Sequence, residues 1–151
     1  MDSMNDTGVV ADPASDQNSH APRLRGLAVT GFIAALAAVV ATTLAAALAQ
    51  VVGVDFEIPD GGETIPLPGF AVVTGFFSLV GVAIAVALLR WSARPAERFV
   101  WTAVSLTVIS FVPPFLAGAN AAATAALLGL HLVAATVMIP TLARSLRKPT
   151  D

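Results

Sequence analysis

The sequence lacks cysteine and contains very little charge. Cysteine is absent from all 151 residues, which excludes disulfide scaffolds, thiolate metal sites and cysteine nucleophiles. Only 12% of the side chains are charged, which is roughly half the share of an ordinary water-soluble domain. The 8 basic and 10 acidic residues give a net charge of -2, so the chain has no basic footprint for nucleic acid. We therefore expect neither a soluble domain nor a nucleic-acid partner.

Long apolar runs take the place of the missing charge. Hydrophobic side chains make up 56% of the chain and the mean hydropathy is +0.81. A helix needs about 20 mostly apolar residues to cross the hydrocarbon core of a bilayer. Segments that meet this requirement cover residues 26–52, 70–89, 95–112 and 121–142. We therefore predict an all-α membrane protein whose transmembrane domain, residues 23–148, is an antiparallel four-helix bundle in the lipid bilayer.

Basic residues indicate the orientation of the predicted bundle. They precede the first apolar run, fill the link between the second and third, and follow the fourth: Arg23, Arg25, Arg90, Arg94, Arg98, Arg144, Arg147 and Lys148. The other two links contain none. Because cytoplasmic loops collect Lys and Arg, we expect a multi-pass protein of the plasma membrane with both termini in the cytoplasm.

The two ends of the chain lie outside the predicted bundle. Residues 1–22 are mostly small or polar and include four aspartates. Such a segment buries too little apolar surface to offset its ordering entropy, so we expect a disordered cytoplasmic tail. The first apolar run is too long for a cleaved secretory signal and is interpreted as an anchor that is retained. Residues 149–151 form a short cytoplasmic end.

The two links without basic residues contain turn signals. In residues 53–69 polar and apolar side chains alternate around Asp60-Gly61-Gly62, which is typical of a β-hairpin. We predict short arms at 54–58 and 63–67 in an extracytoplasmic hairpin-like loop. In the second link, Pro113 should end or kink the third helix, and Gly118 with Asn120 can turn the chain and cap the fourth.

The first of these links is also acidic. It carries Asp55, Glu57, Asp60 and Glu63. Carboxylate oxygens of this kind can hold a hard cation such as calcium. The alternative is a solvated acidic loop, which we favour because an EF-hand spacing is missing and a hairpin would direct the carboxylates to different faces. We predict no metal site.

Isolated polar residues fall near the middle of the predicted spans. They are Thr42, Ser78, Ser105 and His131. An ionisable residue at this depth is a candidate functional site because it is costly there unless paired or hydrated. His131 could relay a proton or bind a transported solute. Alternatively, it only ties helices together through a hydrogen bond, which we favour because no intramembrane Asp, Glu, Lys or Arg accompanies it.

Small residues form a stripe on the first predicted span. They are Ala34, Ala38, Ala41, Ala45 and Ala49. Their spacing of three and four places them on one helical face, where small side chains allow close helix packing in lipid. The stripe predicts packing within the chain or, alternatively, a homo-oligomer.

Several local sequences together resemble a known family. The link has Gly53-Val54-Asp55 and paired glycines, Trp101 opens the third span, the following turn contains proline, and residues 131–140 run from histidine to proline before a basic end. This pattern, from about Arg23 to Arg147, resembles the actinobacterial four-span family of unknown function DUF6069. The resemblance implies a bacterial four-span protein and implies no activity.

Three functions are compatible with these features. We favour a non-catalytic assembly or accessory protein of the cytoplasmic membrane, acting with itself or in a larger complex, and expect no cofactor. The alternative is a small transporter or channel component that uses His131. A membrane enzyme with His131 as base and Ser105 or Ser110 as nucleophile is third, because the sequence offers no complete set of nucleophile, base and orienting residue.

Overall fold

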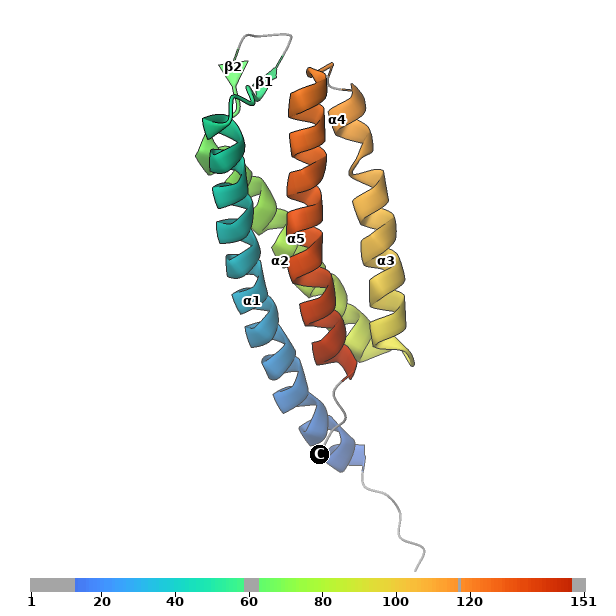
Figure 1. Cartoon of the computed structure of the whole chain (residues 1–151). Coiled ribbons are helices and arrows are strands. Elements are labelled where there is room, and N and C mark those ends of the chain that lie inside the picture. Colours follow the sequence, from blue (N-terminus) through green and yellow to red (C-terminus); the bar gives the residue numbers. More distant parts are fainter. Residues whose placement is uncertain (1–12, 59–62, 117, 148–151) are drawn as a thin grey trace, which may run out of the picture.

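Four long helices make up the protein. The computed structural model describes residues 13–58, 63–116 and 118–147. The helices are α1 (Pro13–Val51), α2 (Leu67–Trp91), α3 (Pro95–Ile109), the short α4 (Val112–Leu116) and α5 (Ala121–Arg147). Residues 21–51, 67–91, 95–116 and 121–147 form helical segments long and apolar enough to span a membrane. Consecutive long helices run in opposite directions (Figure 1), so the predicted four-span membrane protein is confirmed.

The ends of the spans differ from the prediction in ways that follow from proline chemistry. α2 begins at Leu67, three residues before the predicted start of the second span, and Pro68 lies in its first turn. The missing N–H of proline costs nothing at this position. α3 ends at Ile109, and α4 then continues through Pro113 to Leu116. Proline is tolerated at the start of such a new helix for the same reason. The helix therefore breaks between Ile109 and Val112, close to the expected end or kink, and the candidate span continues to Leu116.

The amino-terminal segment also differs from the prediction. α1 begins at Pro13, so residues 13–22 are helical where we expected a disordered tail. Adding residues to an existing helix is much easier than starting one, and the long apolar span supplies that helix. Residues 1–12 and 148–151 lie outside the described residues.

The link between α1 and α2 contains a minimal antiparallel ladder. Strand β1 (Glu57–Ile58) pairs with β2 (Glu63–Thr64), with Glu57 opposite Thr64. The predicted arms were too long, because Pro66 interrupts the second and α2 begins at Leu67. The turn expected at residues 59–62 lies outside the described residues, so the complete hairpin stays a prediction.

Side chains of this link rest on the bundle. Phe56 is 2% exposed and its ring meets that of Phe70 edge to face, with centroids 4.9 Å apart. Ala46 of α1 and Leu130 of α5 complete the cluster. We call this end of the bundle the strand end. Among the described residues, no three His, Asp or Glu side chains converge as metal ligands, and Asp60 lies outside that part of the chain.

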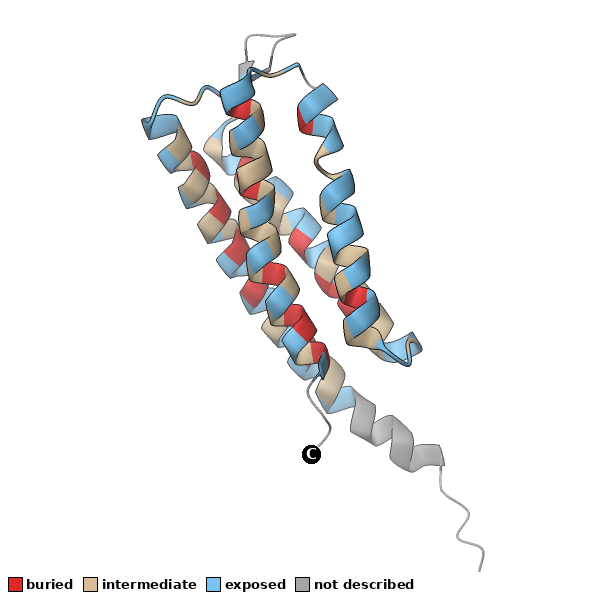
Figure 2. Ribbon diagram, turned by 45° about the vertical axis from the view of Figure 1, so that its right-hand side comes forward, coloured by how far each residue is buried: buried red, intermediate tan, exposed pale blue. Residues whose placement is uncertain are grey.

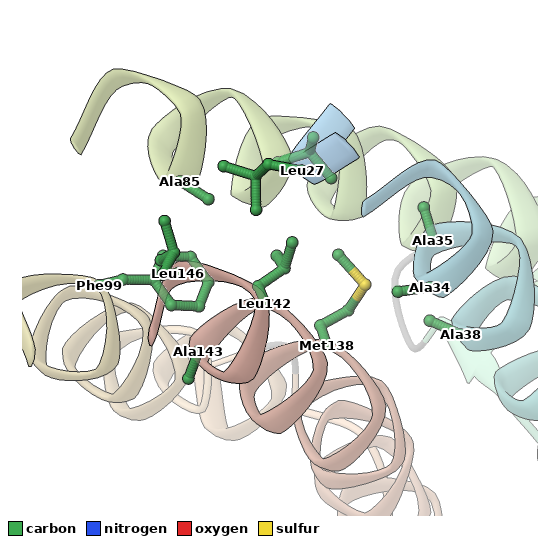
Figure 3. Packing of buried hydrophobic residues seen from close by; sticks show 11 residues of the cluster. Leu27, Ala34, Ala35, Ala38, Ala85, Phe99, Met138, Leu142, Ala143 and Leu146 are labelled. Atoms are coloured by element: carbon green, nitrogen blue, oxygen red, sulfur yellow. The ribbon is translucent and has the colours of Figure 1, made fainter. Parts of the chain in front are cut away.

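The opposite end, called the basic end here, holds every basic residue that the structure describes. A larger apolar cluster fills the bundle near it, where side chains of all four long helices gather around Leu142 (Figure 3). Gly31 lies at a close helix contact: a Cβ atom there would lie 2.8 Å from Val82 Cγ1 and 3.2 Å from Leu142 Cδ2. At the margin, Arg23 Nη2 donates to the Leu146 carbonyl oxygen at 3.3 Å, which joins α1 to the end of α5.

α3 packs less closely than the other spans. α2 packs chiefly against α1, and it crosses behind α5 so that its end lies beside the beginning of α3 (Figure 1). Of the described residues of α3, Phe99 alone is buried. Figure 2 shows the contrast, with buried positions following one face of α1 and of α5. The bundle is thus closed on the α1 side of α5 and more open on the α3 side.

Candidate functional site

A cavity occupies the open side of the bundle. It lies between α2, α3 and α5, with Thr42 of α1 also on its wall, and has a volume of about 410 Å³. This volume is within the range of small-molecule sites, which are mostly apolar with a few polar groups. Among the described residues that line it, none carries a formal charge. The cavity is therefore suited to a neutral, largely apolar molecule.

The cavity opens towards the lipid. Val73 and Phe77 of α2 and Leu106 of α3 line it and are also 56%, 64% and 48% exposed. Residues that both line the cavity and face outwards form the rim of an opening. Because these helices are candidate membrane spans, the exposed apolar rim formed by α2 and α3 would lie against acyl chains.

Three of the four predicted mid-membrane polar residues line this cavity. They are Thr42, Ser78 and His131. Thr42 is 3% exposed and Ser78 6%. Thr42 Oγ1 has no hydrogen-bond partner among the described residues. Burying a hydroxyl without a partner costs free energy, and the same holds for Thr43 Oγ1, which lies away from the cavity wall.

The protonation pattern of neutral His131 follows from its neighbours. Its Nδ1 lies 2.7 Å from the Leu127 carbonyl oxygen. A carbonyl oxygen only accepts, so Nδ1 carries the hydrogen and Nε2 of the neutral ring is an acceptor. The ring also meets Phe111 edge to face, with centroids 6.2 Å apart. Neutral His131 is thus held in the tautomer that has its hydrogen on Nδ1.

The fourth predicted residue, Ser105, does not belong to the site. It is exposed on α3 and is not part of the cavity wall. The α3 wall instead includes Thr102, Thr107 and Ser110. Thr107 Oγ1 donates to the Ala103 oxygen at 2.8 Å, and Ser110 Oγ to the Thr107 oxygen at 2.7 Å. Thr102 and Thr107 were not among the predicted residues, although Thr102 and Ser110 are eight residues apart and thus lie on a similar face of the helix.

The alanine stripe of α1 faces the interior of the bundle over part of its length. Ala34 and Ala38 are 4% and 0% exposed and belong to the basic-end cluster. Ala45 and Ala49 pack against the strand-end cluster, and Ala41 is half-buried. The buried line also passes through Gly31 and Thr42, which the predicted stripe did not include.

Comparison with known proteins places the chain in a family. The model of the family of unknown function DUF6069 matches residues 22–148. The chain belongs to the DUF6069 family. This confirms the resemblance found in the sequence, and the matched range takes in every residue of the cavity wall. Neither a curated protein nor a solved structure matches the chain.

The cavity of this DUF6069 protein has a limited chemical repertoire. It offers an apolar body and a few polar side chains on its wall, among them Ser78, Thr102 and His131. Ser110 Oγ donates to the Thr107 oxygen and His131 Nδ1 lies against the Leu127 oxygen, so these two side chains are bonded to backbone groups of their own segments. These groups can bind and orient a molecule by hydrogen bonds.

Proposed function

We propose that this four-span membrane protein binds a small, mostly apolar molecule from the bilayer, as the substrate-binding component of a small transporter. The observation that carries the proposal is the cavity of about 410 Å³ that opens between α2 and α3 and is lined by Thr42, Ser78 and His131. A site of this shape takes its ligand from the lipid phase, because its rim consists of exposed apolar side chains.

One feature that favoured the assembly hypothesis carries less weight in this arrangement. The alanine stripe of α1 was that feature, and its Ala34 and Ala38 belong to a cluster shared with α2 and α5 of the same chain. Close approach of small residues therefore serves the fold of one chain. A second copy would have to use a different surface.

The binding proposal is tested by filling the cavity. Ala134 of α5 lines it, whereas Ala125 of the same helix is exposed and does not. Purified wild type, Ala134→Phe and Ala125→Phe are placed in lipid nanodiscs with an alkyl diazirine probe and irradiated, and the labelled residues are identified by mass spectrometry. We expect labels on the cavity wall in the wild type and in Ala125→Phe, and their loss in Ala134→Phe.

The contrary result is also clear. Labels confined to the outer surface of the helices in all three proteins would mean that no molecule enters from the lipid. Equal cavity labelling in the wild type and in Ala134→Phe would mean that the labels do not report on the cavity. Either result contradicts the proposed function.

We also propose that the basic end of the bundle faces the cytoplasm of a bacterial cell. Every described basic residue lies there, and Lys and Arg collect on the cytoplasmic side of membrane proteins. A fluorescent reporter that matures only in the cytoplasm, fused after Asp151, should then be bright. Activity of a periplasm-dependent reporter at the same position would contradict this orientation.

A further inference from the structure

We infer that a pocket at the basic end, between the start of α3 and the end of α5, binds the phosphate of an anionic membrane lipid. The pocket has a volume of about 330 Å³, and its polar wall consists of Arg94, Glu97, Trp101 and Arg147. We call it the interfacial pocket. The inference goes beyond the proposed function, because the interfacial pocket and the cavity share no described lining residue.

The ends of two helices place the interfacial pocket at the boundary of the membrane. α3 begins beside the end of α5 (Figure 1), and the candidate spans begin at Pro95 and end at Arg147. The 27 residues of α5 extend about 40 Å, which exceeds the roughly 30 Å of the hydrocarbon core. Trp101 is 69% exposed, and tryptophan collects at the level of the lipid headgroups. The pocket therefore lies at the depth of the lipid phosphates.

The charges on the pocket wall favour an anion. Arg94 Nη1 pairs with Glu97 Oε2 at 3.6 Å, whereas Arg147 makes no ion pair with any side chain that the structure describes. Two guanidinium groups and one carboxylate leave one positive charge unmatched, which equals the single negative charge of a phosphodiester. A guanidinium has five N–H donors, so Arg94 can donate to a phosphate while it offsets the repulsion from Glu97.

The surroundings favour an anionic headgroup over a zwitterionic one. Glu97 is the only acidic residue at the basic end whose side chain the structure describes. Five further arginines lie at the same end: Arg23, Arg25, Arg90, Arg98 and Arg144. Their positive potential would repel the ammonium group of a zwitterionic headgroup and attract a headgroup with net negative charge.

The rest of the wall favours a phosphate that is part of a lipid over a free phosphate ion. Pro95, Ala96 and Val100 supply apolar surface next to the arginines. A free phosphate ion gains nothing from such surface, whereas the glycerol and the first carbons of an acyl chain can cover it. Arginine binds phosphate through paired N–H···O bonds, and basic pockets between transmembrane helices are typical sites for anionic headgroups.

The test compares two lipids that differ in headgroup charge. The full-length protein is placed in nanodiscs of phosphatidylglycerol and phosphatidylcholine in equal amounts with the same acyl chains, and native mass spectrometry measures which lipid stays bound. We expect the wild type to retain phosphatidylglycerol. Arg147→Gln should lower this preference about three- to tenfold, because one charged hydrogen-bond partner is lost. Arg94→Gln should act in the same direction.

Arg144→Gln is the matched control. Arg144 is an exposed arginine in the same last turn of α5, and it does not line the interfacial pocket. The substitution removes the same charge, so the preference should change by less than about twofold. Equal losses in Arg147→Gln and Arg144→Gln would mean that the general charge of the basic end attracts the lipid, which would overturn the pocket as a site.

Two further results would overturn the inference. Equal retention of the two lipids by the wild type would show that the headgroup charge is not recognised. Displacement of the retained lipid by millimolar glycerol phosphate would assign the pocket to a soluble phosphate instead of a lipid.

Discussion

The two sides of α5 are built differently. On the α1 side, Gly31, Ala34 and Ala38 allow the helices to touch, and Leu142 is 0% exposed between them. On the α3 side, Phe99 is the buried contact of α3 within the described chain, and a cavity fills the remaining space. The same helix thus has a closed face that holds the fold together and an open face that carries the site.

The lipid environment makes this division possible. In water, an apolar gap would be closed by the hydrophobic effect, but in a bilayer the acyl chains are as apolar as leucine. An open α3 side loses only dispersion contacts that lipid or a ligand can restore. Close packing is therefore needed on the α1 side alone, and four experiments can break or sharpen this contrast.

The largest effect should come from adding the same ring to each side. Ala38→Phe places a phenyl ring where exposure is 0%, and overpacking should cost about 3 kcal/mol. Ala134→Phe places it in the cavity and should cost less than about 1 kcal/mol. Thermal unfolding of both variants in the same detergent is the measurement. Equal destabilisation would show that the two sides are equally packed.

Gly31 tests the contact between α1 and its neighbours. An added Cβ would lie 2.8 Å from Val82, so Gly31→Ala should lower the free energy of unfolding by about 1–3 kcal/mol. The control is Gly129→Ala on α5, where a Cβ would meet no described atom within 4 Å and alanine should favour the helix by up to about 1 kcal/mol. Stabilisation by both substitutions would contradict the close approach at Gly31.

Two adjacent threonines test the packing of α1 at mid-span. Thr42 Oγ1 and Thr43 Oγ1 are both buried without a hydrogen-bond partner among the described residues. Thr42→Val and Thr43→Val should each stabilise the protein by about 1 kcal/mol, because the isosteric methyl group leaves no buried hydroxyl unpaired. Chemical denaturation of the two variants measures the gain. A loss of stability in either variant would mean that its hydroxyl has a partner.

The smallest expected effect is at the basic end. Arg23 is half-buried and donates across to α5, so Arg23→Gln should cost about 1 kcal/mol. The Arg94–Glu97 pair is local to α3, spans 3.6 Å and has side chains 78% and 58% exposed. Arg94→Gln should therefore change stability by less than about 0.5 kcal/mol. Unfolding curves of the two variants measure both costs. A larger loss of stability in Arg94→Gln than in Arg23→Gln would contradict a tightly held α1.

The number of spans and their residue ranges could largely be predicted from the sequence, because a bilayer demands long apolar segments whatever their packing. The buried face of each span could not. In a soluble helix a polar stripe marks the exposed face, but lipid accepts apolar side chains on every side. Ser105 and Thr107 therefore looked equivalent as small polar residues of one span, and only the fold places Ser105 outside and Thr107 on the cavity wall.

Short sequence patterns predicted the turns better than they predicted the packing of the helices. Asn120 was expected to cap the last helix, and its Oδ1 accepts from the Ala123 amide at 2.8 Å. Gly118 has a φ of 65°, a conformation that few other residues adopt. The cavity, by contrast, depends on the way α2 and α3 spread apart from the link that joins them (Figure 1). No short sequence pattern encodes this divergence.

The central claim, that space on the α3 side of α5 is open to the bilayer, can be measured with dissolved oxygen. Oxygen partitions into lipid and apolar cavities and enhances the relaxation of methyl groups that it reaches. In nanodiscs with isotope-labelled alanine, the methyl of Ala134 should show a much larger enhancement than that of Ala38, which is 0% exposed on the closed side. If Ala134 is protected as strongly as Ala38, the two sides of α5 are alike and the account is wrong.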